Sequence, residues 1–299
     1  MSSQYIKCPA CNKQELFVPF KIRPTLDYRS TLSDQIFYIA KCKSCGYVRQ
    51  YPIADPDVYK NLGYHTQKNY DDHCRDRAEY IFNFLNIHYI ISRYGSPFRI
   101  LDIGSGAGGV GYYLKHKLAE YHRNVHVTGV TLHEEPKTYI KTFYLNADDV
   151  DDLNKLPKHK YDLIIMSHSL EHLLHPEVVL EHINTTLLNK NGLLYIEVPS
   201  LYTEGVRMHG TFIANHISYF TKTSLNNIVR TNTSLKLIKM HQSNYWGSIK
   251  SLYMKTRSQK KSRYIKERFV EIKYLLSQIK NAFNSFKVNN GIKVPESNE

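Results

Sequence analysis

The sequence predicts an α/β protein whose core is a doubly wound, mostly parallel seven-stranded sheet, with a small N-terminal module and a C-terminal helical tail. Three observations predict it. Short apolar strands alternate with helical stretches from residue 98 onward, a glycine-rich loop follows the first of these strands, and two pairs of cysteines precede them. Strands that alternate with helices form a parallel sheet covered on both faces.

The elements follow from the spacing of apolar residues. Apolar runs predict strands at residues 98–103, 125–130, 142–145, 162–166 and 193–198. The segments 235–240 and 248–256 predict a terminal antiparallel hairpin. Helical spacing predicts helices over residues 74–94, 108–121 and 176–188. In a sheet of this kind, the ligand lies beyond the carboxyl ends of the strands.

Composition divides the chain into four regions. We expect a module over 1–55, a linker with lid helices over 56–97, the sheet domain over 98–257 and a basic tail over 258–299. A heptad seam predicts that the tail helix pairs with another helix, for example in a homo-oligomer. The seam consists of Ile265, Phe269, Ile272, Leu276, Ile279, Phe283 and Phe286.

Charge and hydropathy limit the kinds of partner that the protein can have. The formal net charge is +13, which favours acidic partners such as nucleotides, nucleotide-linked molecules, nucleic acid or an anionic membrane face. No apolar run reaches the ~18 residues that a membrane span needs. The N-terminus has no hydrophobic stretch typical of a secretory signal, so we expect a cytoplasmic protein.

The glycine-rich loop reads Leu101-Asp102-Ile103-Gly104-Ser105-Gly106-Ala107-Gly108-Gly109. Glycine is needed where the backbone passes close to a ligand or takes positive φ. The helix that follows adds free N–H groups and a partial positive charge at its N-terminus. The spacing also matches the fingerprint of dinucleotide-binding folds, so two cofactor classes compete for this loop.

Two details separate these classes. Asp102 stands directly before the loop, where it would repel a pyrophosphate but attract a ligand with an ammonium group. A dinucleotide site also needs an acidic residue at the end of the next strand, but that strand ends in Gly129-Val130-Thr131. The loop therefore favours a methyl donor with an amino-acid end over a dinucleotide.

The loop resembles motif I of the class I methyltransferases. Two further runs, at residues 161–172 and 191–199, resemble the motifs of that family around its fourth strand and after its fifth. The resemblance spans about residues 95–255 and implies an enzyme that uses S-adenosylmethionine. It implies cofactor contacts from Asp102, Gly104, Ser105, Gly106, Gly108, Thr131, Glu134, Asp149 and His168.

One departure from the family concerns the ribose. Most members carry an acid at the end of the second strand, whereas Thr131 takes that place here, as in a subgroup that includes cyclopropane fatty-acid synthases. Glu134, just beyond it, is therefore the candidate ribose ligand. Asp148 or Asp149 after the third strand is the candidate for the adenine, and a solvated acidic loop is the alternative.

The cysteines form two Cys-x-x-Cys pairs, Cys8 with Cys11 and Cys42 with Cys45. Each pair turns two thiolates toward one ion, and two pairs complete a tetrahedral set. Four protein ligands leave no open position, so we expect a structural Zn²⁺. Cys74 stands alone and is expected to be a buried helix thiol.

The order of these parts resembles that of sugar C-methyltransferases that act on nucleotide-linked keto-sugars. A zinc ribbon comes first, then a Tyr-rich segment, then the methyltransferase core. Those proteins carry a Glu-His pair in a segment that here reads Asn215-His216-Ile217-Ser218-Tyr219-Phe220, with Asn215 in place of the Glu. Their long C-terminal domain is absent from this sequence. A related O-methyltransferase fits equally well.

The donor is a reactive sulfonium, so the protein must align the acceptor and remove its proton. Histidine is the natural base near neutral pH. We expect His216 to be that base, with Tyr64 and Tyr219 orienting a small-molecule or nucleotide-sugar acceptor. The alternatives are RNA methylation that uses the ribbon and the basic surface, and a non-enzymatic assembly role for the tail.

Overall fold

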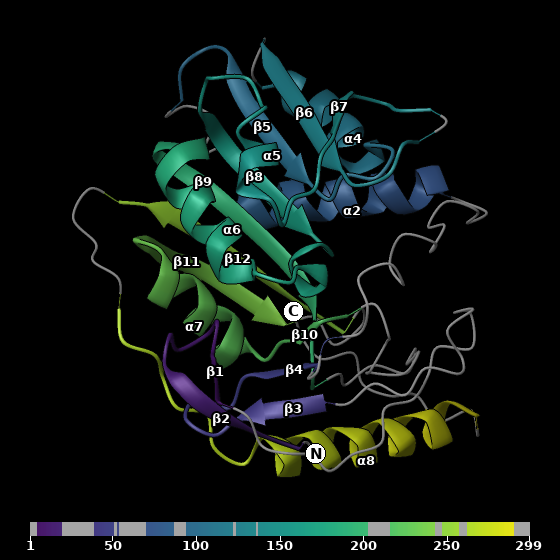
Figure 1. The fold of residues 1–299 in the computed structure, drawn as a ribbon. Coiled ribbons are helices and arrows are strands. Elements are labelled where there is room, and N and C mark those ends of the chain that lie inside the picture. Colours follow the sequence, from purple (N-terminus) through teal and green to yellow (C-terminus); the bar gives the residue numbers. More distant parts are fainter. Residues whose placement is uncertain are drawn as a thin grey trace.

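The computed structural model describes residues 5–19, 39–50, 53, 70–86, 94–121, 124–135, 137–202, 216–242, 247–256 and 262–289. Two sheets organise these segments (Figure 1), one of seven strands and one of five. Tyr64 and Asn215 lie outside the described residues.

The seven-stranded sheet has the strand order β11-β12-β9-β8-β5-β6-β7. Its strands are β5 (Phe98–Ile103), β6 (Val125–Thr131), β7 (Lys141–Tyr144), β8 (Tyr161–Ser167), β9 (Leu188–Pro199), β11 (Leu235–Gln242) and β12 (Ser248–Lys255). The strands from β9 to β7 pair in parallel, and β12 and β11 complete the sheet as antiparallel neighbours. This arrangement confirms the predicted fold class, including the terminal hairpin.

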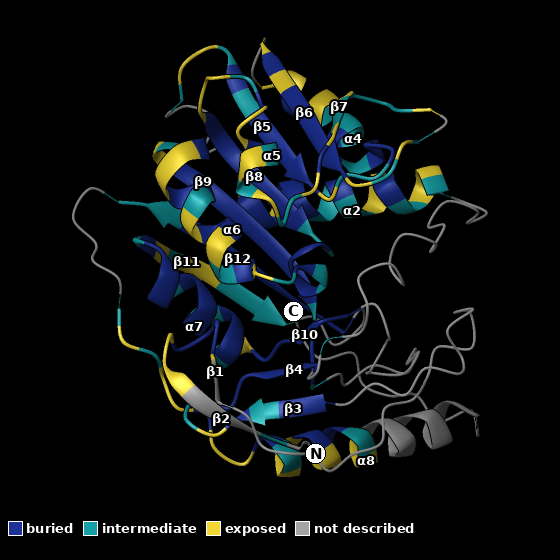
Figure 2. Cartoon of the chain, viewed as in Figure 1, coloured by how far each residue is buried: buried dark blue, intermediate teal, exposed yellow. Residues whose placement is uncertain are grey.

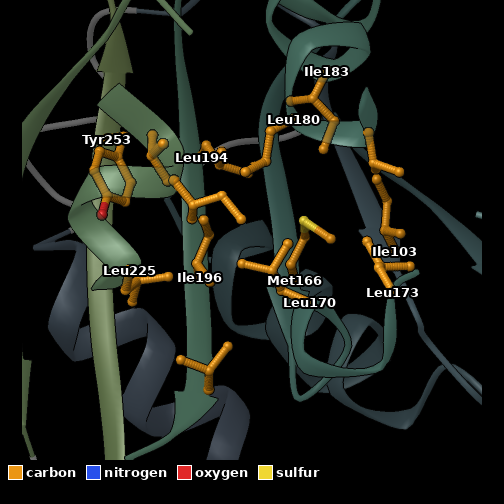
Figure 3. Packing of buried hydrophobic residues seen from close by; sticks show 14 of the residues in the cluster. Ile103, Met166, Leu170, Leu173, Leu180, Ile183, Leu194, Ile196, Leu225 and Tyr253 are labelled. Carbon is orange, nitrogen blue, oxygen red and sulfur yellow. The ribbon is translucent and has the colours of Figure 1, made fainter. Parts of the chain in front are cut away.

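Both faces of this sheet are buried, as the apolar strand sequences require. Side chains alternate between the faces of a strand. In β8, Leu163 and Ile165 pack in one apolar cluster, whereas Ile164 and Met166 pack in the other. The second cluster continues through Leu194, Ile196 and Tyr253 on neighbouring strands (Figure 3). Burial on both faces explains why the strands are continuous apolar runs.

Helices cover the two faces. α2 (Tyr70–Leu85) and α4 (Gly109–Ala119) pack together on one face, while α5 (Val150–Leu153), α6 (Pro176–His182) and α7 (Lys222–Asn232) cover the other (Figure 2). The helix predicted over 176–188 is shorter, because a π turn at Ile183–Leu187 ends it. β9 then begins at Leu188, which pairs with Tyr161.

The five-stranded sheet joins distant parts of the chain in the order β1-β2-β3-β4-β10. Its strands are β1 (Tyr5–Lys7), β2 (Gln14–Pro19), β3 (Ile39–Cys42), β4 (Val48–Gln50) and β10 (Ser218–Tyr219). The first four belong to the predicted N-terminal module. β10 was not expected there: it lies after the last parallel strand, and Ser218 pairs with Arg49. The small sheet therefore receives a strand from the part of the chain that forms the large sheet.

Hydrogen bonds fasten the small sheet to the large one through the end of α7. The Asn232 side chain accepts a hydrogen bond from Asn12 Nδ2 at 2.7 Å and donates one to the Pro9 carbonyl at 2.8 Å. Thr231 Oγ1 donates to the Ala10 carbonyl at 3.3 Å. All three partners on the small sheet lie at or next to the first cysteine pair, so this turn is fixed against the sheet domain.

The tail helix α8 (Val270–Asn289) lies along the small sheet (Figure 1). Val270 and Tyr274 are buried against that sheet, whereas Ile272, Leu276 and Ile279 of the predicted seam are more than half exposed. The helix begins after the first two predicted seam positions, Ile265 and Phe269, so these two do not belong to it. None of the helices in the described segments combines the length and apolar character that a membrane span requires.

Candidate functional site

The glycine-rich loop connects β5 to α4 at the carboxyl end of the sheet. Gly104 and Gly108 have φ angles of 82° and 84°, a region that favours glycine. A side chain at Gly104 would also clash with Ser169, and one at Gly108 would meet Ile140 at 2.5 Å. The N–H groups of Gly104 and Ser105 donate to the Val130 carbonyl at the end of β6. The loop is therefore held tightly between two neighbouring strand ends.

Asp102 lies at the end of β5 and is almost fully buried. Burial raises the pKa of its carboxyl to about 7, and the nearby charge of Arg77 offsets part of that rise. A bound ammonium group would return the carboxyl to its ionised form, since an opposite charge favours ionisation. Asp102 therefore has the position and the chemistry expected for the amino-acid end of the donor.

The other predicted cofactor residues differ in how close they lie to this loop. Thr131 is buried at the end of β6, next to the Val130 carbonyl that anchors the loop. Glu134 is exposed three residues further on. Asp149 is also exposed, and its carboxylate accepts a hydrogen bond from Asp151 N at 2.9 Å as the cap of α5. Asp148 instead accepts one from His175 N, which joins two loops at this edge.

His168 follows β8 and lies between two buried carboxylates. Its Nδ1 is 3.4 Å from Glu171 Oε1, and its Nε2 is 3.6 Å from Glu197 Oε1. Burial and the charge of Arg77 would lower the pKa of this imidazole, but the two carboxylates raise it above its ordinary value. The two carboxylates therefore favour the protonated form of His168, in which the ring is not a proton acceptor.

Glu197 is the centre of this polar network. Ser167 Oγ and Ser248 Oγ donate hydrogen bonds to its carboxylate at 3.0 and 3.1 Å, and buried Lys250 Nζ lies 3.9 Å away. Burial would raise the pKa of Glu197, but His168, Arg77 and Lys250 together lower it well below its usual range. The carboxylate therefore stays charged at the carboxyl end of β9.

A second cluster lies beside His168, on η1 (Leu170–His172) and the segment that enters β10. One ligand atom from each of Glu171, His172 and His216 lies within 4.8 Å of the other two. The Ile217 N–H donates to the Glu171 carbonyl at 2.8 Å, which sets His216 against Glu171. The rings of His172 and His216 meet edge to face at 4.9 Å.

The three residues predicted to act on the acceptor fall in different surroundings. His216 is buried, and burial together with the charge of His172 lowers its pKa to about 3. Tyr219 packs in an apolar cluster with Ile39, Val48 and Tyr274, and its ring lies 6.4 Å from that of His216. Tyr64 lies outside the described residues. The neutral imidazole of His216 is thus a weak base by itself.

The four paired cysteines come together as predicted. Cys8 Sγ lies 3.7 Å from Cys45 Sγ, and Cys11 Sγ lies 3.9 Å from Cys42 Sγ, with all four sulfurs within 4.8 Å of one another. Sulfurs bound to one zinc at ~2.3 Å are about 3.8 Å apart in a tetrahedron. All four side chains are buried, so their spacing and chemistry fit an enclosed Zn²⁺.

Sequence reasoning missed several members of the site. Glu171, Glu197 and Lys250 are buried charges, and the first two occur within runs that the family resemblance quotes. Arg77 lies on α2, where its charge acts on Asp102, His168 and Glu197. A charged residue at an otherwise apolar strand end could have revealed Glu197. The position of Arg77 on an ordinary polar helix face carries no such signal.

Two curated plant proteins share part of this sequence. The chain is 30% identical over 105 residues to (S)-tetrahydroprotoberberine N-methyltransferase of Eschscholzia californica, a match that covers 33% of this chain and 29% of that protein. It is 30% identical over 106 residues to N-methyltransferase 4 of Papaver somniferum, covering 32% and 29%. The match therefore spans less than a third of either relative.

Among solved structures, the chain is similar to 1,6-didemethyltoxoflavin-N1-methyltransferase of Burkholderia thailandensis, crystallised with S-adenosylhomocysteine. The identity is 18% and the TM-score 0.45, covering 79% of this chain and 100% of that one. The sequence profile of the family described as "Methyltransferase domain" matches residues 68–233, more than half of the chain. The chain therefore belongs to the methyltransferase-domain family, and the prediction of a methyltransferase is confirmed at the level of that family.

Proposed function

We propose that this protein transfers a methyl group from S-adenosylmethionine to a small acceptor. The observation that carries the proposal is the tight loop at Gly104, closed against Val130, with buried Asp102 beside it. The loop would bind the amino-acid end of the donor, and Asp102 would pair with its ammonium group. Thr131, Ser105, Gly106, Gly108 and His168 complete this binding surface, with Glu134 and Asp149 as outer candidates for the ribose and adenine.

The acceptor would lie on the side of η1 and His216. Ser169, which directly precedes η1, is the residue that a side chain at Gly104 would strike. The donor loop and the acceptor side are therefore in direct contact. His216 is unprotonated at neutral pH, as a proton acceptor must be, and Tyr64 and Tyr219 remain the candidates for orienting the acceptor.

We infer a sugar or a nucleotide-linked sugar as the acceptor. The support is the order of parts along the chain, in which paired cysteines precede a Tyr-rich segment and the methyltransferase core. The structure adds that β10 of the small sheet leads directly from His216. In this proposal the N-terminal module helps to build the acceptor side, which explains why it occurs together with the methyltransferase core.

The test combines binding with product detection. We expect S-adenosylhomocysteine to bind the full chain with one site in a calorimetric titration. Incubation with the donor and a panel of nucleotide-sugars should then give a product one methylene heavier by mass spectrometry. Transfer of label to RNA in a parallel incubation would contradict the sugar acceptor, and failure to bind S-adenosylhomocysteine would contradict the methyltransferase itself.

We also propose that Cys8, Cys11, Cys42 and Cys45 bind a structural Zn²⁺. Long-range contacts hold both Cys-x-x-Cys turns in place, which supports this role. The first is fastened to α7, and the carbonyl of Cys45 in the second accepts a hydrogen bond from Glu267 N at 3.1 Å. An enclosed set of four sulfurs leaves no position for a substrate. We expect one tightly held zinc per chain from this cluster, measured by elemental analysis.

The exposed seam of α8 supports self-association of the tail. Ile272, Leu276 and Ile279 recur at heptad spacing on the side away from the small sheet. A narrow seam at this spacing fits a second helix, because each residue enters a gap between residues of the partner. We propose a second copy of this chain as that partner.

A further inference from the structure

The cluster of Glu171, His172 and His216 is not explained by methyl transfer alone. Two imidazoles and a carboxylate converge from two separate segments, η1 and the approach to β10. Glu171 and His216 are both more than nine-tenths buried. Such groups are costly to bury without strong partners, so their convergence calls for a physical reason.

Glu171 is the most deeply buried of these three side chains. Its side chain is only 1% exposed, and neither carboxylate oxygen accepts a well-aligned hydrogen bond from the part of the chain that the structure describes. The nearest nitrogens belong to His168 at 3.4 Å and His172 at 3.9 Å, both to the same oxygen, Oε1. His168 offsets part of the charge of this buried carboxylate at Oε1, whereas Oε2 has no hydrogen-bond donor among the described residues, a situation that a further positive group would relieve.

We propose that Glu171, His172 and His216 bind a divalent transition-metal ion. The donor set of two imidazoles and one carboxylate suits Mn²⁺, Fe²⁺, Co²⁺ or Zn²⁺ and leaves positions open for other ligands. Ligand atoms bound to one ion at ~2.1 Å lie up to about 4.2 Å apart, so atoms within 4.8 Å need only small side-chain rotations to close around it.

The surroundings support an exchangeable ion. His168 and His172 side chains are 30% and 26% exposed, so solvent reaches this edge of the cluster. The cysteine cluster differs in both respects, since its four sulfurs are enclosed and offer soft ligands. The chain would therefore hold two kinds of metal site, one permanent and one that exchanges its ion and its outer ligands.

If His216 binds the ion, its lone pair is no longer free to accept a proton, and the ion would activate the acceptor in its place. This step rests on the proposed function, and it names an acceptor that presents a hydroxyl oxygen. Coordination lowers the pKa of a bound hydroxyl, so its proton leaves to solvent. The oxygen lone pair then attacks the methyl carbon, the carbon–sulfur bond breaks, and its electron pair remains on sulfur as S-adenosylhomocysteine.

The test measures Mn²⁺ binding to the zinc-loaded full chain by electron paramagnetic resonance. Mn²⁺ prefers oxygen and nitrogen ligands, so the cysteine cluster does not compete for it. We expect one Mn²⁺ site, weakened at least ~10-fold by either Glu171→Gln or His216→Gln. His175→Gln is the matched control, because His175 lies in the same loop region with an exposed side chain and outside the cluster.

Titration of S-adenosylhomocysteine into the same samples separates this inference from the proposed function. Binding of S-adenosylhomocysteine, the product formed from the donor, without binding of Mn²⁺ would overturn the metal site alone. If the wild type does not bind S-adenosylhomocysteine, the proposed function is overturned, whereas binding of Mn²⁺ would still support a metal site at the cluster. Circular dichroism confirms folding of each variant. A Mn²⁺ affinity that is equal in wild type and both cluster variants would contradict the assignment.

Discussion

The two sheets of this protein are assembled in opposite ways. The strands of the seven-stranded sheet all lie between β5 and β12 in the chain, whereas the five-stranded sheet combines N-terminal strands with β10, the one described strand of that stretch that lies outside the large sheet. The large sheet supplies the donor loop from adjacent strand ends. The small sheet supplies the strand that leads from His216. The proposed donor site is therefore encoded locally, whereas the proposed acceptor side depends on contacts between distant segments.

This difference also separates the sources of stability. The large sheet buries apolar side chains on both faces, and the cysteine turns pack against one of its two clusters. The small sheet, with strands of three to six residues in its N-terminal part, buries little by itself. Small modules of this kind need a metal or another cross-link to fold. The predictions below test whether the two sheets respond differently to the same kind of change.

The largest effect should follow Cys42→Ser. It removes one of four ligands, so zinc should be lost and the free energy of unfolding should fall by on the order of 4 kcal/mol or more. The change would be measured by elemental analysis and urea denaturation. Cys74→Ser, a buried thiol on α2 outside the cluster, is the control and should keep the zinc. Full zinc content in Cys42→Ser would contradict the claim that the four cysteines of the small sheet bind the metal.

Asp102→Asn should weaken S-adenosylhomocysteine binding ~10- to 100-fold at pH 8, because it removes a charged partner of the ammonium group. At pH 8 the same variant should have a higher free energy of unfolding than the wild type. A buried carboxyl with a raised pKa is least costly when protonated, so stability falls as pH rises from its unfolded pKa toward 7. Calorimetry and thermal unfolding measure the two effects, and equal affinities would refute the role of Asp102.

Asn232→Ala should loosen the joint between the sheets. It removes the donor to the Pro9 carbonyl and leaves the Asn12 amide with only its 3.4 Å hydrogen bond to the Thr231 carbonyl, at a cost of about 1–3 kcal/mol. Hydrogen exchange should rise in β1 to β4 and stay unchanged in β5, β6 and β8. A uniform rise across both sheets would show instead that they unfold as a single unit.

The pH dependence of donor-product binding should be moderate and traceable to Asp102. Below pH 7 the free carboxyl becomes protonated, and binding must then expel that proton, so affinity should fall by up to about tenfold per pH unit. Above pH 7 affinity should level off. Asp102→Asn should lack this difference between pH 6 and pH 8, and an identical slope in both proteins would assign the titration to another group.

The smallest effect on either sheet should come from the tail seam. Leu276→Glu places a charge on the exposed side of α8, so light scattering should show a lower molecular mass while zinc content and donor-product affinity stay unchanged. Arg268→Gln lowers the net charge by the same one unit at an exposed position off the seam, so it is the charge-matched control. If Leu276→Glu has the same mass as the wild type, the tail does not join two copies through this seam.

The sequence was most informative where a function depends on neighbouring residues. The strand at 98–103, the glycine loop and the cysteine pairs each lie within a few positions, so their spacing alone indicates their geometry. The convergence of Glu171 with His216 depends on the pairing of β10 with β4, which no local pattern encodes. The burial of Glu197 and the reach of Arg77 likewise depend on packing between distant elements.

The most direct test of the account is the binding of S-adenosylhomocysteine to the zinc-loaded full chain, with NADH as the competing ligand. The loop at Gly104 and buried Asp102 predict a single site for S-adenosylhomocysteine and no displacement by NADH. Binding of NADH at this loop, or the absence of any heat with S-adenosylhomocysteine, would contradict the central claim that the large sheet holds a methyl donor.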